Sequence, residues 1–169
     1  MKMTMDRQIS CLVLVAVLIS ASPAMSAEEQ FDDYQTGLDA YNVGDLPGAL
    51  KSFRKAAESG SADAQVWLGY ILDQSEANEE SVRWYRAAAE QGNVDGIAGL
   101  AEMHAKGEGV EKDHEQALIL FKKAGEAGHA GSIRVLIAAY ANGGLGVTQD
   151  TTELAYWKAK ESALNAGDN

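Results

Sequence analysis

The chain has 169 residues, 25 of them acidic and 14 basic, which gives a formal net charge of −11. So acidic a chain repels phosphate backbones and anionic lipid headgroups, which argues against nucleic acids and membrane surfaces as partners. Its one cysteine, Cys11, excludes an internal disulfide.

The first predicted element is an export signal. Lys2 and Arg7 precede the apolar run CLVLVAVLI, and SASPAMSA follows it. The run is shorter than the roughly 20 residues that a membrane-spanning helix needs, so the layout is that of a secretory signal peptide. We expect cleavage after Ser26 or Ala27; the alternative is an uncleaved N-terminal anchor. Because Cys11 begins the run and is distant from the cleavage site, a lipoprotein anchor is not expected.

Export predicts a location in the bacterial periplasm, with secretion as the second choice. Removal of residues 1–27 would leave 12 basic and 24 acidic residues, a net charge of −12, and no cysteine. No membrane insertion is expected after that removal. The negative charge has two interpretations, simple solubility or attraction to a basic partner.

Residues 28–169 are predicted to form a single domain of helical hairpins. The phrases FRKAAESG, YRAAAEQG and FKKAGEAG are versions of one pattern and end at Gly60, Gly92 and Gly128. Glycine at such a position favours the left-handed end of a helix. A single hairpin buries only part of its apolar face, so hairpins of this kind stack on one another. The four expected repeats are about 31–60, 61–92, 93–128 and 129–167.

Capping residues mark the expected helix starts within these repeats. Asp45 and Pro47 fit the start of the second helix in the first repeat, and Asn78 fits the corresponding start in the second. In the third repeat, Gly107 ends the first helix, and Asp113 begins the next. The closing phrase LAYWKAKESALNAG is more polar than its counterparts, which suits a terminal cap. No segment shows the sustained period-two alternation of a strand.

The unit from Asn93 to Gly128, NVDGIAGLAEMHAKGEGVEKDHEQALILFKKAGEAG, resembles the Sel1-like repeat, a relative of the tetratricopeptide repeat. The shared features are the small-x-x-x-Leu-small pattern, Gly-x-Gly-Val, the following Asp and Ala, and the closing Gly. The resemblance covers roughly Phe31 to the C-terminus. It implies an all-α fold, a right-handed α-solenoid of four helix-turn-helix repeats.

The sequence lacks a recognisable constellation for catalysis or metal binding. His104, His114 and His129 do not stand at the spacings of a metal site. The connectors KGEGVEKD and GGLGVTQD lack the lysine followed by Ser or Thr that completes a phosphate loop. We therefore expect no catalytic residue, no metal site and no cofactor.

The resemblance implies instead a binding surface, because the first helices of tetratricopeptide-like repeats line a concave face where peptides bind. The candidate contacts are positions that face this groove when the repeats are aligned. They are Tyr34, Leu38, Tyr41, Tyr70, Asp73, Gln74, Glu102, Lys106, Arg134 and Asn142. Each tyrosine has an alternative role in packing between repeats, and for Tyr41 both interpretations stay open.

The leading hypothesis is a non-enzymatic periplasmic adaptor that binds a protein or peptide in its concave groove. One alternative is an enzyme acting on cell-wall fragments or β-lactams, an analogy weakened here because the paired cysteines of such relatives are absent. Another alternative is a structural subunit of an envelope complex. The partner's identity and the oligomeric state do not follow from the residues.

Overall fold

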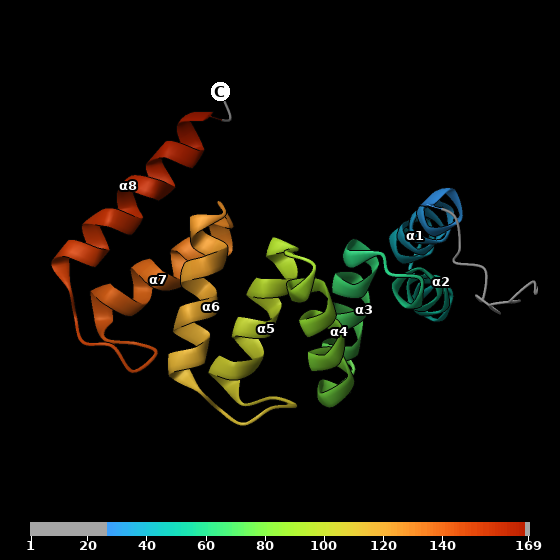
Figure 1. Cartoon of the computed structure of the whole chain (residues 1–169), viewed down its shortest axis with the longest axis horizontal. Helices are drawn as coiled ribbons and strands as arrows, with labels where there is room; N and C mark the ends of the chain where they lie inside the picture. Colours follow the sequence, from blue (N-terminus) through green and yellow to red (C-terminus); the bar gives the residue numbers. More distant parts are fainter. Residues whose placement is uncertain (1–26, 168–169) are drawn as a thin grey trace, which may run out of the picture.

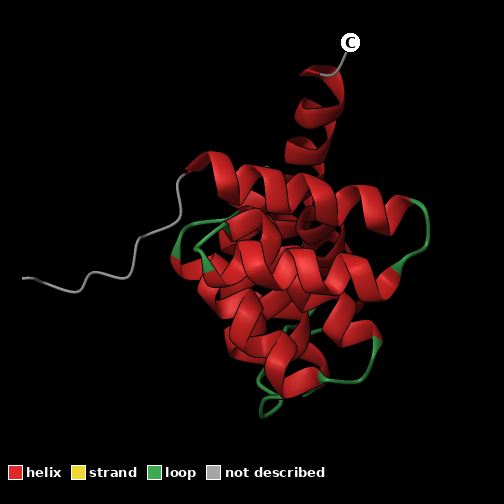
Figure 2. Cartoon of the chain, turned by 90° about the vertical axis from the view of Figure 1, so that its right-hand side faces the viewer, coloured by secondary structure: helices red, strands yellow, loops and turns green. Residues whose placement is uncertain are grey.

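The computed structural model describes residues 27–167, so the predicted signal peptide lies outside the described residues except for Ala27. Within that range the chain is entirely helical apart from its connectors, with no strand (Figure 2). The helices are α1 (Ala27–Asn42), α2 (Leu46–Glu58), α3 (Ala62–Gln74), α4 (Asn78–Glu90), α5 (Val94–Lys106), α6 (His114–Glu126), α7 (Ala130–Asn142) and α8 (Thr151–Gly167).

Consecutive helices pack as the hairpins α1/α2, α3/α4, α5/α6 and α7/α8, and each second helix also packs on the first helix of the next hairpin. Figure 1 shows the hairpins following one another along the long axis of the molecule. The predicted fold, an all-α solenoid of four helix-turn-helix repeats, is therefore confirmed. The first helices α3 and α5 also pack directly on each other, which places first helices on the inner side of the stack.

Aromatic rings of second helices lie against small residues of first helices. A Cβ added at Gly37 would lie 2.6 Å from the ring of Phe53, and one added at Gly69 would lie 3.0 Å from the ring of Tyr85. Both rings are buried. Because a side chain larger than hydrogen would collide with these rings, the glycines allow the two helices of a hairpin to approach closely enough to exclude water.

The connector of the second hairpin departs from the others. Gly44, Gly107 and Gly143 follow the other first helices with positive φ, whereas Glu76 takes a φ of 61° after α3, where no glycine is available. The helix begins at Asn78, as predicted, but Asn78 does not cap it: the capping position is Ala77, which offers no side-chain acceptor.

Two capping side chains also join neighbouring repeats. The amide oxygen of Asn93 accepts the N–H of Gly96 at 3.0 Å and so caps α5. The amide nitrogen of the same residue donates to the carboxylate of Asp63 on α3 at 2.7 Å. The Asn93 side chain therefore caps the first helix of one repeat and is hydrogen-bonded to the first helix of the repeat before it.

His129 repeats this arrangement one hairpin later. Its Nδ1 accepts the N–H of Ser132 at 3.0 Å and caps α7. Its Nε2 lies 3.5 Å from the carboxylate of Asp95 on α5. Since Nδ1 is the acceptor, the proton of the neutral ring belongs on Nε2, where it points toward Asp95.

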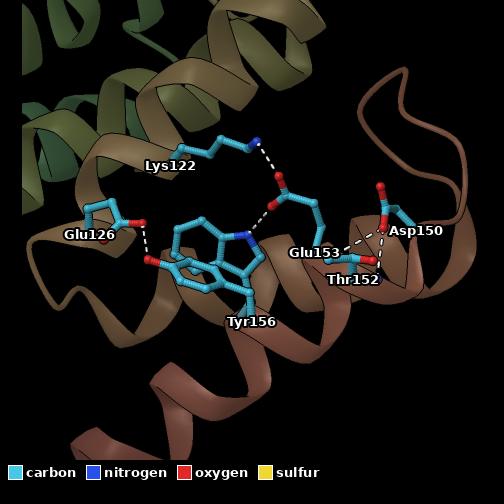
Figure 3. Close-up of polar contacts among 7 residues, drawn as sticks. Lys122, Glu126, Asp150, Thr152, Glu153 and Tyr156 are labelled. Atoms are coloured by element: carbon cyan, nitrogen blue, oxygen red, sulfur yellow. Dashed lines mark hydrogen bonds and ion pairs between the residues drawn. The ribbon is translucent and has the colours of Figure 1, made fainter.

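The last hairpin is joined to the third through Glu153 (Figure 3). Asp150 accepts the N–H groups of Thr152 at 2.8 Å and of Glu153 at 3.1 Å, which caps α8. The Glu153 carboxylate then binds Lys122 on α6 at 3.1 Å and accepts the indole N–H of Trp157 at 2.9 Å. Because Trp157 is buried, the Glu153 carboxylate orients a ring of the core and also forms an ion pair with Lys122.

A second contact between α6 and α8 centres on Glu126, which accepts the Tyr156 hydroxyl at 2.6 Å and pairs with Lys160. Lys160, and then the Tyr156 hydroxyl, hold the pKa of Glu126 below its usual range. Exposed ion pairs of this kind add little stability. Their effect is to fix the direction of α8, whose end projects beyond the stack (Figure 2).

We predict that Asn93→Asp lowers the free energy of unfolding by about 1 kcal/mol, because the cap survives while the bond to Asp63 becomes a repulsion between carboxylates. Combining Asn93→Asp with Asp63→Asn should recover most of the loss, since donor and acceptor are then exchanged. Urea unfolding of the single and double variants measures the effect. A double variant no more stable than Asn93→Asp would show that the bond between repeats has no energetic role.

Candidate functional site

A hollow of about 440 Å³ opens on the inner side of the stack, across the first three hairpins. We call it the aromatic hollow. Its lining residues are Tyr41, Val66, Trp67, Tyr70, Tyr85, Asp95, Ala98, Gly99, Glu102 and His129. They come from α1, α3, α4, α5 and the capping position of α7, so the hollow exists only when the hairpins are stacked.

Three rings give the hollow its aromatic side. Tyr41 packs on Trp67 with ring centroids 4.9 Å apart and planes inclined by 59°, and Tyr70 meets Trp67 edge-on at 6.1 Å and 89°. The neighbouring hydroxyl of Tyr70, and then partial burial, raise the pKa of Tyr41. Tyr70 is 41% exposed, which is unusual for a large ring in contact with two others. The rings are thus held together and still open to solvent.

The hollow has a specific cause in the sequence. Phe53 of the first hairpin stacks on Trp67 of the second, with centroids 5.6 Å apart and planes 8° from parallel. In the next hairpin Tyr85 takes the place of Phe53, and Gly99 takes the place of Trp67. A Cβ added at Gly99 would lie 2.5 Å from the Tyr85 ring. Where the first junction is filled by an indole, the second is left open by a glycine.

The opposite side of the hollow is acidic. Asp95 and Glu102 lie seven residues apart on α5, which places them on one face of the helix. His129 faces Asp95, whereas no ion pair of the described residues involves Glu102. Burial, followed by the nearby carboxylates of Asp73 and Glu102, raises the pKa of Tyr85, so this hydroxyl stays neutral. The lining therefore combines ring faces with negative charge.

The end of the groove beyond Glu102 is formed by Asp73, Lys106 and Glu108. Partial burial raises the pKa of Asp73, and Lys106 acts in the opposite direction. Lys106 itself is engaged by Glu108, 3.2 Å away, and the hydrogen bond between them raises the pKa of Lys106. The cation nearest to the acidic side is therefore already paired.

Of the predicted contacts, Tyr41, Tyr70 and Glu102 line the aromatic hollow. Asp73 and Lys106 lie at its end, and Gln74 is exposed at the end of α3. Tyr41, for which the sequence left binding and packing open, packs on Trp67 and also lines the hollow. Its role in binding stays a prediction.

The remaining predicted contacts lie outside the hollow. Tyr34 and Leu38 pack against the core of the first hairpins, with Tyr34 6.0 Å from the Phe53 ring. Arg134 and Asn142 are exposed on α7. They do not belong to the lining of the hollow, and their place in a binding surface stays a prediction.

The sequence did not single out Trp67, Tyr85, Asp95, Gly99 or His129 as groove residues, although all five line the hollow. A signal for two of them was present. Gly99 replaces the aromatic residue found at Trp67 when the repeats are aligned, and His129 stands in the capping position that Asn93 occupies one repeat earlier. Nothing in the linear pattern indicates that the ring of Tyr85 reaches a second hairpin.

The rest of the described residues offers no comparably specific site. A depression between the α3–α4 and α5–α6 connectors, lined by residues 76–80, Arg83 and Gly109, has no aromatic ring. In residues 27–167, no group of three or more His, Cys, Asp or Glu side chains is arranged to hold a metal ion. Over the same residues, no helix combines the length and the apolar character needed to cross a bilayer.

We predict that Gly99→Ala destabilises the protein by about 1 kcal/mol, because displacement of the Tyr85 ring outweighs the better helix propensity of alanine. Thermal unfolding of the variant provides the measurement. In a Tyr85→Leu background the same change should become neutral or stabilising, because the ring that would collide with the new Cβ is absent. Stabilisation by Gly99→Ala in the wild-type background would show that the hollow is not shaped by this contact.

The same repeats are found in known proteins. A model of the Sel1 repeat matches residues 62–93 and 94–129. The curated relatives include an uncharacterised protein of Neisseria meningitidis, 30% identical over 115 residues, which cover 67% of this chain and 24% of that protein. They also include human protein sel-1 homolog 2, 35% identical over 128 residues, which cover 70% of this chain and 18% of that protein. The chain thus spans less than a quarter of either relative.

Two solved structures share the fold. A Sel1 repeat protein from Oxalobacter formigenes superposes with a TM-score of 0.72 at 27% identity, over 79% of this chain and 56% of that one. A protective antigen present in uropathogenic Escherichia coli strains, with the same fold, gives a TM-score of 0.71 at 30% identity, over 79% of this chain and 30% of that one. Because the family model, the relatives and the solved structures agree with the helical stack described above, this chain belongs to the Sel1 repeat family.

Proposed function

We propose that this protein is a non-enzymatic adaptor that binds a segment of a protein partner along the inner surface of its stack, in the bacterial periplasm. The observation that carries the proposal is the aromatic hollow, a partly open ring cluster on the face formed by the first helices. Interface hot spots are enriched in such tyrosine and tryptophan side chains.

Family membership supports the general part of this function. Sel1 repeats generally mediate protein–protein interaction, and the proteins that carry them are typically adaptors rather than enzymes. Stacked hairpins provide an extended surface and no enclosed chamber, which suits recognition of a chain segment.

The shape of the inner surface favours an elongated ligand. Its described side chains extend from Tyr41 on α1, through Tyr70 and Glu102, to Arg134 on α7. The aromatic hollow provides one apolar anchoring point, and the exposed polar residues beyond it provide a wetter rim. Interfaces with a few desolvated anchors surrounded by polar contacts are common among protein partners.

The periplasmic location rests on the N-terminal segment, whose charged start and short apolar run are typical of export signals. The high negative charge of the remaining chain is compatible with either solubility or a basic partner.

Photo-crosslinking tests the groove and the location together. A photoreactive amino acid is placed at Tyr70 or at Arg134, and matched controls carry it at the exposed Arg86 of α4 or Lys123 of α6. We expect the two groove positions, and not the controls, to capture one specific protein in a product released by osmotic shock. Capture from the second helices alone would contradict the groove, and a product retained with the cytosol would contradict the location.

A further inference from the structure

We propose that the aromatic hollow holds the guanidinium group of an arginine side chain presented by the partner. This inference rests on the proposed function for the source of the arginine. The chemistry of the hollow itself is independent of it, because it follows from the rings and carboxylates that line the space.

The aromatic side of the hollow suits a planar cation. Tyr41 and Tyr70 are inclined to Trp67 by 59° and 89°, so the three ring planes bound a common space from different directions. A cation is attracted to the negative face of an aromatic ring, and tryptophan and tyrosine provide the strongest such faces. The contacts of both tyrosine rings with Trp67 are present without a ligand.

The acidic side supplies the matching charge. The lining contains the carboxylates of Asp95 and Glu102 and contains neither lysine nor arginine. His129 is turned toward Asp95, and Lys106 at the end of the groove is engaged by Glu108. Glu102 forms no ion pair among the described residues, and Lys106, which interacts with it through space, is itself bound to Glu108. A cation that enters the hollow therefore meets a carboxylate that the protein neutralises only in part.

Arginine fits this combination better than other side chains. An apolar side chain would remove water from Glu102 without replacing its interactions, and an acidic side chain would be repelled. Lysine carries the charge but has no plane to lie against Trp67 or Tyr70. A guanidinium group stacks on rings and offers several donors to a carboxylate at once.

The test uses blocked arginine, with acetylated amino and methylamidated carboxyl groups, and the isotope-labelled protein purified from cells that express the full chain. The readout is the NMR resonance of the Trp67 indole N–H, assigned by its loss in Trp67→Phe. The indoles of Trp84 and Trp157 donate to Glu80 and Glu153 outside the hollow and serve as internal references. We expect saturable movement of the Trp67 resonance alone.

Blocked citrulline is the neutral control of the same shape, and we expect it to bind at least about fivefold more weakly than blocked arginine. Glu102→Gln should weaken arginine binding by about threefold or more. The matched variant Glu90→Gln, which removes an equal charge from the second helix α4, should leave it unchanged. Unshifted Trp84 and Trp157 resonances in each variant show that the fold is intact.

Three results would overturn the proposal: no response of Trp67 to blocked arginine, equal binding of citrulline and arginine, or unchanged binding in Glu102→Gln. These results are distinct from failure of the adaptor function. If crosslinks from Tyr70 capture a partner while citrulline binds as well as arginine, the groove function stands and the arginine site is wrong. If arginine binds selectively while groove crosslinks capture nothing, the adaptor function is wrong.

Discussion

The stack depends on contacts that an aromatic ring of a second helix makes with the first helices on both sides of it, as at its first two junctions. Phe53 lies on Gly37 within its own hairpin and on Trp67 of the next, and Tyr85 lies on Gly69 and Gly99 in the same way. Each ring is therefore shared by two repeats. Without a cysteine in residues 28–169, stacking relies on this packing, helped by caps that reach back to the previous repeat.

The same contact explains why one junction differs from its neighbour. At the first junction an indole fills the space beside the second-helix ring, and at the second a glycine leaves it open. The open junction lies beside Trp67 and Tyr70, and Asp95 and Glu102 face it from α5. The hollow thus accompanies a difference of one residue between aligned repeats, and the stack is continuous on either side of it.

Much of the fold could be predicted from the sequence because its signals are local. Glycines after second helices, the caps at Asp45 and Asp113, and the repeated phrases each report on a few adjacent residues. The site depends on distances between hairpins, which the linear pattern does not contain. Tyr41 and Glu102 could be placed on the inner face by alignment, but the pairing of His129 with Asp95, and the hollow beside Gly99, arise only when α3, α5 and α7 are stacked.

In the proposed complex, a partner segment lies along the first helices with a cation in the hollow between α3 and α5. The most direct measurement is NMR cross-saturation from the captured partner to the isotope-labelled protein. The account predicts that saturation reaches the Trp67 indole and the backbone amides of α3 and α5, including Glu102. Saturation confined to α2, α4 and α6, with Trp67 unaffected, would contradict it.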